Sequence, residues 1–134
     1  MSDDQSNNSA APPGFAFVDR PCDYRDPSAL VVHVPAKARG KEKLLGVLAR
    51  GLRFPSYFGW NWDALDECLR DLSWLGDVRK ITIVHDGRPF SPGGELFALY
   101  GDLLAEAVAA QQSAAEPREL KIVFSSELRG EFNS

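Results

Sequence analysis

Two carboxylates spaced four residues apart, Asp63 and Glu67, are the side chains of this sequence best placed to do chemistry together. On a helix, side chains at positions i and i+4 lie on one face, so a helical segment would point both acids the same way. Four aromatic residues come directly before the acids, at Tyr57, Phe58, Trp60 and Trp62. Aromatic rings beside exposed charges are typical of surfaces that contact another molecule. We therefore expect residues 54–69 to form a binding surface.

The residues after Asn61 repeat with helical spacing, and this pattern predicts how the acids are held. At about 100° per residue, one side of the helix is apolar and the other is charged. The apolar side holds Ala64, Leu65, Cys68, Leu69 and Leu72, and the charged side holds Asp63, Asp66, Glu67 and Arg70. Asn61 is expected to cap the helix, and Asp63 lies in the first turn, where a carboxylate meets the positive end of the helix dipole. This helix should end near residue 72 or 73, with its acids pointing outward.

Other functions for these side chains are less consistent with the sequence. A pair of carboxylates can act as general acid and base, but that role needs a cleft, whereas these acids lie on the convex side of a helix. The aromatic rings could stack on single-stranded RNA, but the neighbouring acids repel phosphate. The chain carries a net charge of −4, and phosphate binding needs a basic surface. We therefore expect neither an enzyme nor a nucleic-acid-binding protein.

The charges are unevenly distributed along the chain. Residues 37–53 hold six basic residues and one acid, whereas residues 57–77 hold five acids and one base, Arg70. A solvated helix face is the simplest explanation of the basic segment, and the same explanation applies to the acids unless another observation singles them out.

Length and composition indicate one domain without a cofactor. The chain has 134 residues, 44% of them hydrophobic, which suffices for a single core. No apolar run is long enough to span a membrane, and the polar residues 1–8 do not form a signal peptide, so we expect a cytoplasmic protein. Cys22 and Cys68 lack metal-ligand spacing, and no glycine-rich phosphate loop is present, so we expect no disulfide, metal or other cofactor.

Apolar runs and helical periodicity predict the remaining elements. Three β-branched runs should form core strands, at residues 29–34, 80–85 and 120–125, and residues 15–18 could add a short strand. Two more helices are expected, at residues 41–52 and 95–112, with a loop at residues 86–94.

Long connections that contain helices imply parallel pairing of the three core strands. Right-handed crossovers between sequential neighbours would place every helix on one face of the sheet. The sequence therefore predicts a two-layer α/β domain, with a three-stranded parallel sheet of order 1-2-3. Residues 1–13 are expected to be a disordered tail, residues 14–28 an N-terminal extension, and residues 29–134 the domain itself.

The ordered motif at residues 57–69 resembles the core motif of the barstar family of ribonuclease inhibitors. The matching residues are Tyr57, Phe58, Gly59, Asn61, Asp63, Ala64, Leu65, Cys68 and Leu69. The basic helix before this motif and the strand-helix-strand order after it agree with the barstar-like fold. The resemblance covers about residues 29–126, so the first 28 residues would be an addition to the family pattern.

The resemblance implies a small intracellular immunity protein, as in toxin-antitoxin pairs, that binds a secreted or contact-delivered ribonuclease 1:1. A ribonuclease cleft presents cations to the phosphodiester, and a carboxylate on a rigid helix can take the place of that phosphate. By family position, Glu67 would enter the phosphate site, Asp63 would pair with an Arg or Lys of the enzyme, and Tyr57 would pack against its cleft. Such a protein should be a monomer when free.

The resemblance also extends to the loop and to the last helix. Gly59 is expected to adopt a backbone conformation closed to other residues, Asn61 to hold the helix start, and Trp60 and Trp62 to add aromatic contacts. Glu106 stands about where the family has a further acid that contacts the enzyme, although residues 107–119 form a longer region than in barstar.

One position departs from the family, because barstar has a tryptophan where this chain has Asp66. This exchange of an aromatic anchor for a third carboxylate puts the choice of partner in question. The alternative function is therefore a barstar-fold module that binds a non-ribonuclease toxin or a regulatory partner.

Overall fold

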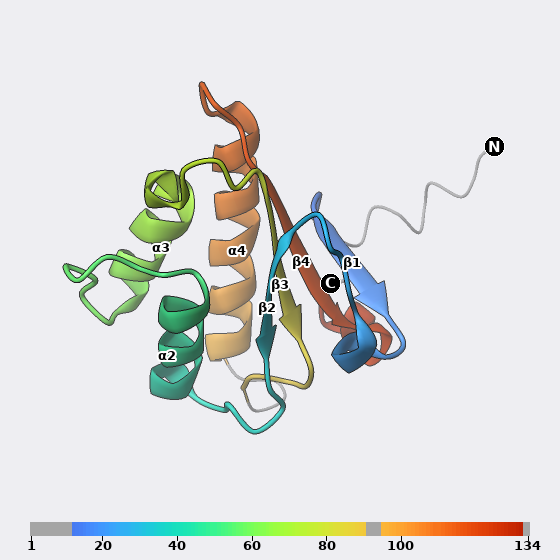
Figure 1. The fold of residues 1–134 in the computed structure, drawn as a ribbon. Helices are drawn as coiled ribbons and strands as arrows, with labels where there is room; N and C mark the ends of the chain where they lie inside the picture. Colours follow the sequence, from blue (N-terminus) through green and yellow to red (C-terminus); the bar gives the residue numbers. More distant parts are fainter. Residues whose placement is uncertain (1–11, 91–94, 133–134) are drawn as a thin grey trace.

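The computed structural model describes residues 12–90 and 95–132 and shows an α/β fold in two layers (Figure 1). In chain order its elements are β1 (Phe15–Val18), the 3-10 turn η1 (Pro21–Asp23), β2 (Leu30–Val34), α2 (Lys41–Gly51), α3 (Trp62–Asp71), η2 (Ser73–Leu75), β3 (Lys80–His85), α4 (Glu95–Ser113), β4 (Glu119–Ser125) and η3 (Ser126–Phe132). The three expected helices and the three expected core strands are confirmed within a few residues. Most of the expected tail, and residues 91–94 of the expected loop, lie outside the described residues.

The sheet is parallel throughout and has four strands in the order β1-β4-β3-β2. The three core strands are sequential neighbours, as expected, but the prediction of a three-stranded sheet is wrong because β1 pairs with β4. That pairing runs from Phe15 beside Ile122 to Val18 beside Ser125. Local pattern could not reveal it, because β1 has only four residues and its partner lies more than 100 positions further along the chain.

Gly14 permits the entry into β1. Its φ is +86°, and a Cβ at this position would lie 2.7 Å from Cγ1 of Val108 on α4. Any other residue would be strained in backbone conformation and would collide with the helix. The backbone carbonyl of Gly14 accepts a hydrogen bond from the N–H of Ile122 (2.9 Å), which places the new strand against β4.

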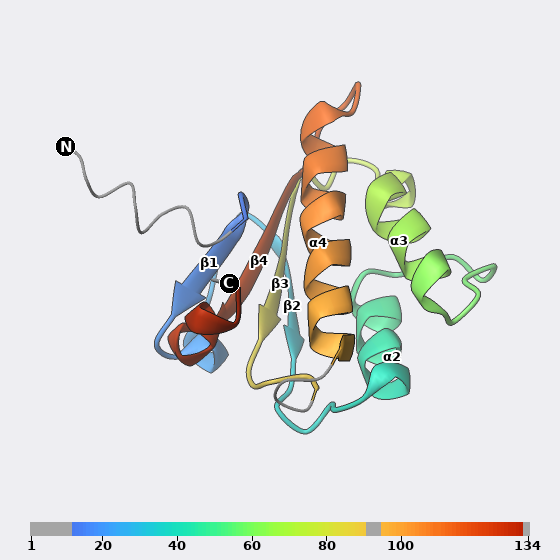
Figure 2. The ribbon, with the colours of Figure 1, turned by 180° about the vertical axis from the view of Figure 1, so that it is seen from behind.

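Helices α2, α3 and α4 cover one face of the sheet, and the view from behind in Figure 2 shows the same arrangement. Because β1 and β2 occupy opposite edges, the segment that joins them crosses the other face, where η1 contacts β3 and β4. Polar contacts fasten this segment to the strands. The Tyr24 hydroxyl accepts a hydrogen bond from Nζ of Lys121 (3.0 Å), and Asp26 forms an ion pair with Lys80 (3.4 Å).

His85 and Tyr100 form a buried polar pair in the core between the sheet and the helices. Both side chains have no exposed surface. His85 Nε2 lies 2.7 Å from the Tyr100 hydroxyl and Nδ1 lies 3.0 Å from the carbonyl oxygen of Val123. A neutral imidazole that carries its proton on Nδ1 satisfies both contacts, since Nδ1–H donates to Val123 and Nε2 accepts from Tyr100. Burial lowers the pKa of His85 to about 4 and raises the pKa of Tyr100.

The described part of the chain contains no helix that combines the length and the apolar character needed to cross a membrane.

His85 makes the stability of the fold dependent on pH. Its pKa is about 4 in the folded protein, against 6.5 for a free histidine. Between these two values the unfolded chain is protonated at this histidine and the folded chain is not, so a fall in pH favours unfolding. We expect the free energy of unfolding to fall by about 2 kcal/mol between about pH 7 and about pH 5. Urea unfolding at both values measures this change.

His85→Gln should lose most of this dependence on pH, because glutamine does not titrate and the two states then no longer differ in protonation at this position. The matched control is His33→Gln, which removes the other histidine of the chain, a half-buried one, and should keep the dependence. An equal slope in the parent protein and in His85→Gln would contradict the prediction.

Candidate functional site

Helix α3 packs its apolar side into the core and leaves its acidic side exposed, as the sequence predicts. Leu65 and Leu69 have no exposed surface, and Cys68 is 5% exposed. Asp63 and Glu67 are exposed, and the half-buried Asp66 lies between them in sequence. The burial of one side of the helix therefore fixes the direction in which the carboxylates point.

Both ends of α3 are held by specific hydrogen bonds. Asn61 is the N-cap, as predicted, and its Oδ1 accepts from the N–H of Ala64 (2.7 Å). At the other end Leu72 adopts the left-handed conformation (φ 54°), and its N–H donates to the carbonyl of Cys68. The buried amide of Gln111 on α4 donates to the carbonyls of Leu69 (2.9 Å) and Arg70 (3.0 Å). The helix is thus fixed both to its own loop and to α4.

The aromatic residues before α3 have different environments. Tyr57 is 73% exposed and Trp60 is 55% exposed, so both are available for contact. Phe58 is buried, and its ring centroid lies 5.2 Å from that of Trp60. Trp62 is half-buried, with its ring 6.0 Å from Phe90 and 6.2 Å from Tyr100. Two rings therefore face solvent while two support the loop from the core.

The expectation for Gly59 is wrong, because the left-handed backbone conformation belongs to Trp60 (φ 59°). A Cβ on Gly59 would make ordinary contacts, 3.5 Å from the side chains of Ala64 and Asn61. A bulky residue seldom adopts positive φ, so the loop is strained at the tryptophan. The residue type does not predict this conformation at position 60, since positive φ is typical of glycine or asparagine and not of tryptophan.

Asp63 and Glu67 form no ion pair with any part of the chain that the structure describes. Beside Glu67 lies a hollow of about 130 Å³, which Tyr57, Phe58, Ala64, Cys68 and Asp71 also line. The family motif thus places an exposed ring and an exposed carboxylate at the rim of one depression. A cation or ring of another molecule could enter there without displacing an internal partner.

Asp66 and Glu106 are brought together by Arg70, which the sequence analysis did not assign to the site. Nε of Arg70 donates to Oδ1 of Asp66 (2.9 Å), and its terminal nitrogen donates to Oε1 of Glu106 (3.0 Å). The hydrogen bond and the charge of Asp66, with a smaller contribution from Glu106, raise the pKa of Arg70. The spacing from Asp66 to Arg70 could have revealed the first contact, but Glu106 lies 36 positions away and gives no local signal.

The thiol of Cys68 lies on the buried side of α3, directly behind the acids. Burial, followed by the charges of Asp71 and Glu67, raises the pKa of this thiol. Nucleophilic attack requires the thiolate, so the environment disfavours a reactive cysteine. No group of three His, Cys, Asp or Glu side chains in the described ranges is arranged to hold a metal ion.

A capped helix with outward acids, beside a loop with exposed rings on an α/β scaffold, is more typical of protein-binding domains than of catalytic clefts. The family model described as "Barstar (barnase inhibitor)" matches residues 29–125, and the chain belongs to this family. Proteins of the barstar family are inhibitors rather than enzymes. Searches of curated proteins and of solved structures found no match.

Removal of the cap tests whether Asn61 holds α3 in place. We expect Asn61→Ala to lower the free energy of unfolding by about 1 kcal/mol, because the N–H of Ala64 loses its acceptor. Chemical denaturation measures the change. Asn61→Asp, which keeps an oxygen at the same place, should restore most of the stability, and an equal loss in both variants would contradict the capping role.

Proposed function

We propose that this protein inhibits a basic ribonuclease, secreted or delivered by contact, by binding it 1:1 over its active site. The observation that carries the proposal is the pair Asp63 and Glu67, exposed one helical turn apart on a helix fixed at both ends. The producing cell would be protected from its own toxin in the cytoplasm. The free inhibitor would be a monomer, with residues 29–134 as the inhibitory domain and residues 14–28 as an extension.

Charge mimicry gives the physical basis of the inhibition. A ribonuclease binds the phosphodiester with Arg, Lys or His, and these side chains form strong, charge-assisted hydrogen bonds with carboxylates. Glu67 would occupy the phosphate site, and Asp63 would pair with a neighbouring cation of the enzyme. Because α3 is already ordered, little conformational entropy is lost when the complex forms.

The rest of the contact surface surrounds these two acids. Tyr57, which lines the hollow, and Trp60 of the same loop would supply aromatic anchors, and such exposed rings commonly contribute much of the energy of an interface. The complete proposed contact set is Tyr57, Gly59, Trp60, Asn61, Trp62, Asp63, Asp66, Glu67 and Glu106. Within it, Trp62 would act mainly by supporting the loop, since its ring packs on Phe90 and Tyr100.

Arg70 would influence the choice of partner. It already binds Asp66 and Glu106, so a cation of the enzyme must compete with it for these two acids. Asp63 and Glu67, by contrast, meet the enzyme without internal competition from the described residues. We therefore infer that Asp63 and Glu67 supply most of the binding energy, and that Asp66 and Glu106 discriminate between ribonucleases.

Charge removal at the two free acids tests the proposal. A barnase-like ribonuclease is titrated with the parent protein, with Asp63→Asn and with Glu67→Gln, and the inhibition constant is measured from RNA cleavage. We expect each variant to inhibit at least about 30-fold more weakly, since a hot-spot residue contributes about 2 kcal/mol or more.

Glu127→Gln is the matched control, because it removes one exposed negative charge from η3. It should inhibit as the parent does to within about threefold. The proposal fails if no barnase-like ribonuclease is inhibited, or if both acid variants inhibit as strongly as the parent. A toxin other than a ribonuclease, captured from the native cell and released by Glu67→Gln, would support the alternative partner class.

The kinetics of association test the electrostatic part of the proposal. Arg70→Gln removes a positive charge from the acidic surface, so we expect faster association with a basic ribonuclease at low ionic strength. The difference from the parent should shrink as salt rises, because salt screens the charges. Stopped-flow fluorescence measures both rates. Association that is independent of salt in both proteins would rule out steering by charge.

A further inference from the structure

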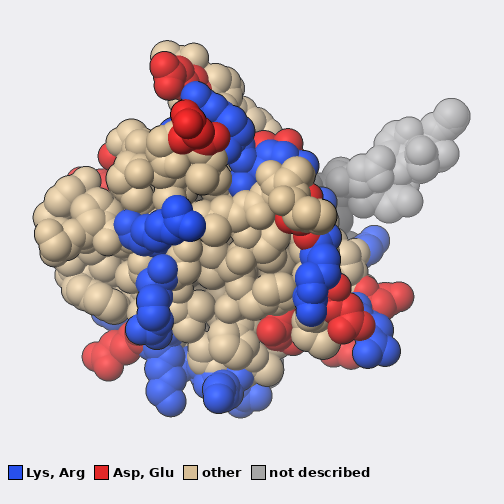
Figure 3. Space-filling view, in the orientation of Figure 1, with Lys and Arg blue, Asp and Glu red and all other residues tan. Residues whose placement is uncertain are grey.

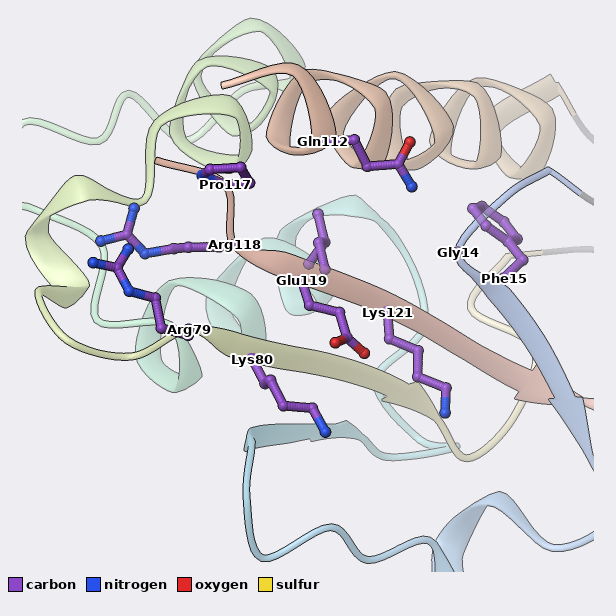
Figure 4. A pocket seen from close by; sticks show the side chains of 10 residues that line it. Gly14, Phe15, Arg79, Lys80, Gln112, Pro117, Arg118, Glu119 and Lys121 are labelled. Carbon is purple, nitrogen blue, oxygen red and sulfur yellow. The ribbon is translucent and has the colours of Figure 1, made fainter. Parts of the chain in front are cut away.

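A second concave site, separate from the acidic surface, lies where β3 and β4 begin and α4 ends. It has a volume of about 690 Å³, and the polar residues that line it are Arg79, Lys80, Gln112, Arg118, Glu119 and Lys121 (Figure 4). Four of these residues are basic and one is acidic. Figure 3 shows basic side chains in this part of the surface, with acidic side chains beside them. The pocket is thus positive, although the chain as a whole carries a charge of −4.

Arg118 is the fixed cation of this pocket. Its side chain is held by the carbonyls of Val78 (3.0 Å, from Nε) and Gly76 (2.8 Å), and only 8% of the residue is exposed. Within the described ranges no carboxylate forms an ion pair with it. Two hydrogen bonds use two of the five N–H groups of a guanidinium. The positive charge is therefore rigid, poorly hydrated and not neutralised by an internal acid.

The other three cations are held to different degrees. Lys121 is engaged by Tyr24, whose hydroxyl accepts from Nζ (3.0 Å) and whose ring centroid lies 5.3 Å from it. Lys80 is engaged by Asp26 at 3.4 Å. Arg79 reaches Glu116 only at 4.0 Å, and both side chains are more than half exposed. Arg79 is thus able to turn toward an anion at small cost.

The uncharged residues of the pocket indicate which organic group a bound anion would carry. Phe15, Pro117 and Leu120 give the pocket an apolar side, and the exposed amide of Gln112 can both donate and accept hydrogen bonds. A volume of this size suits a small organic ligand. Guanidinium groups match phosphate oxygens in geometry and charge, and apolar walls suit a heterocyclic base.

We propose that this pocket binds a nucleotide. Arg79 and Arg118 hold its phosphates, and the apolar wall with Gln112 contacts its base. None of these residues belongs to the acidic surface of α3, so the proposal stands apart from ribonuclease inhibition. An ordinary solvated patch, in which Arg118 only supports the loop before β3, would bind no nucleotide in a saturable way.

The test is a titration of the isotope-labelled full chain by NMR, with ADP, pyrophosphate and adenosine as probes. We expect saturable shifts at the amides of residues 79–80 and 118–121. ADP should bind most tightly, pyrophosphate more weakly, and adenosine most weakly. Arg79→Gln should weaken ADP binding roughly tenfold, the loss expected for one charge-assisted contact.

The matched control is Lys43→Gln, which removes an exposed cation of α2 outside the pocket and should leave ADP affinity unchanged. The midpoint of thermal unfolding should be the same in the variants and in the parent, which shows that a loss of ADP affinity does not come from unfolding. Adenosine binding as tight as that of ADP, ADP binding no tighter than pyrophosphate, or equal weakening by Lys43→Gln would each overturn the proposal. So would binding of a 5′-phosphorylated RNA oligonucleotide without binding of ADP.

Discussion

The attachment of α3 to α4 through the buried amide of Gln111 is the interaction on which the candidate binding surface depends. A helix of ten residues is marginally stable by itself, and its last carbonyls would lack donors. Gln111 supplies donors to the carbonyls of Leu69 and Arg70 from a position that is 1% exposed. Removal of such a buried partner leaves polar groups unsatisfied at a cost of about 1–3 kcal/mol. The orientation of the acids is therefore set by α4 as much as by α3.

Elements whose causes are local could be predicted from the sequence. Strands β2, β3 and β4 are apolar runs, the helices are periodic, and the N-cap at Asn61 follows from its residue type and place. Contacts between distant segments could not. The short strand expected at residues 15–18 is present as β1, but its pairing with β4 has no local signal, and the bond from Arg70 to Glu106 joins two helices far apart in sequence.

Backbone strain was the other feature hidden from the sequence. Three residues that are not glycine adopt positive φ among those described, Arg53, Trp60 and Leu72. They lie after α2, in the aromatic loop and at the end of α3, so they mark the limits of the candidate binding segment. None has a side chain that favours this conformation, and tertiary packing imposes it. The glycine of the motif suggested the right loop but the wrong residue.

The charge of arginine is used differently on the exposed face of α3 and in the pocket at the start of β3 and β4. On α3, Arg70 is bonded to the carboxylates of Asp66 and Glu106, and its charge is offset. At the ends of β3 and β4, Arg118 is held by carbonyl oxygens, which orient a guanidinium without neutralising it. The same residue type thus moderates an acidic surface in one place and creates a positive pocket in the other.

The backbone of the aromatic loop is strained at Trp60, and ring contacts hold it in this conformation. The left-handed backbone of Trp60 costs about 1–2 kcal/mol, and its ring contacts, with Phe58 at 5.2 Å and over Gly46 of α2, offset this cost. The loop therefore has its shape before any partner arrives, and α2 shares in setting it. A Cβ at Gly46 would lie 3.9 Å from the ring of Trp60, an ordinary contact, so a side chain larger than that of alanine at this position of α2 would press on the loop although it is remote from the acids in sequence.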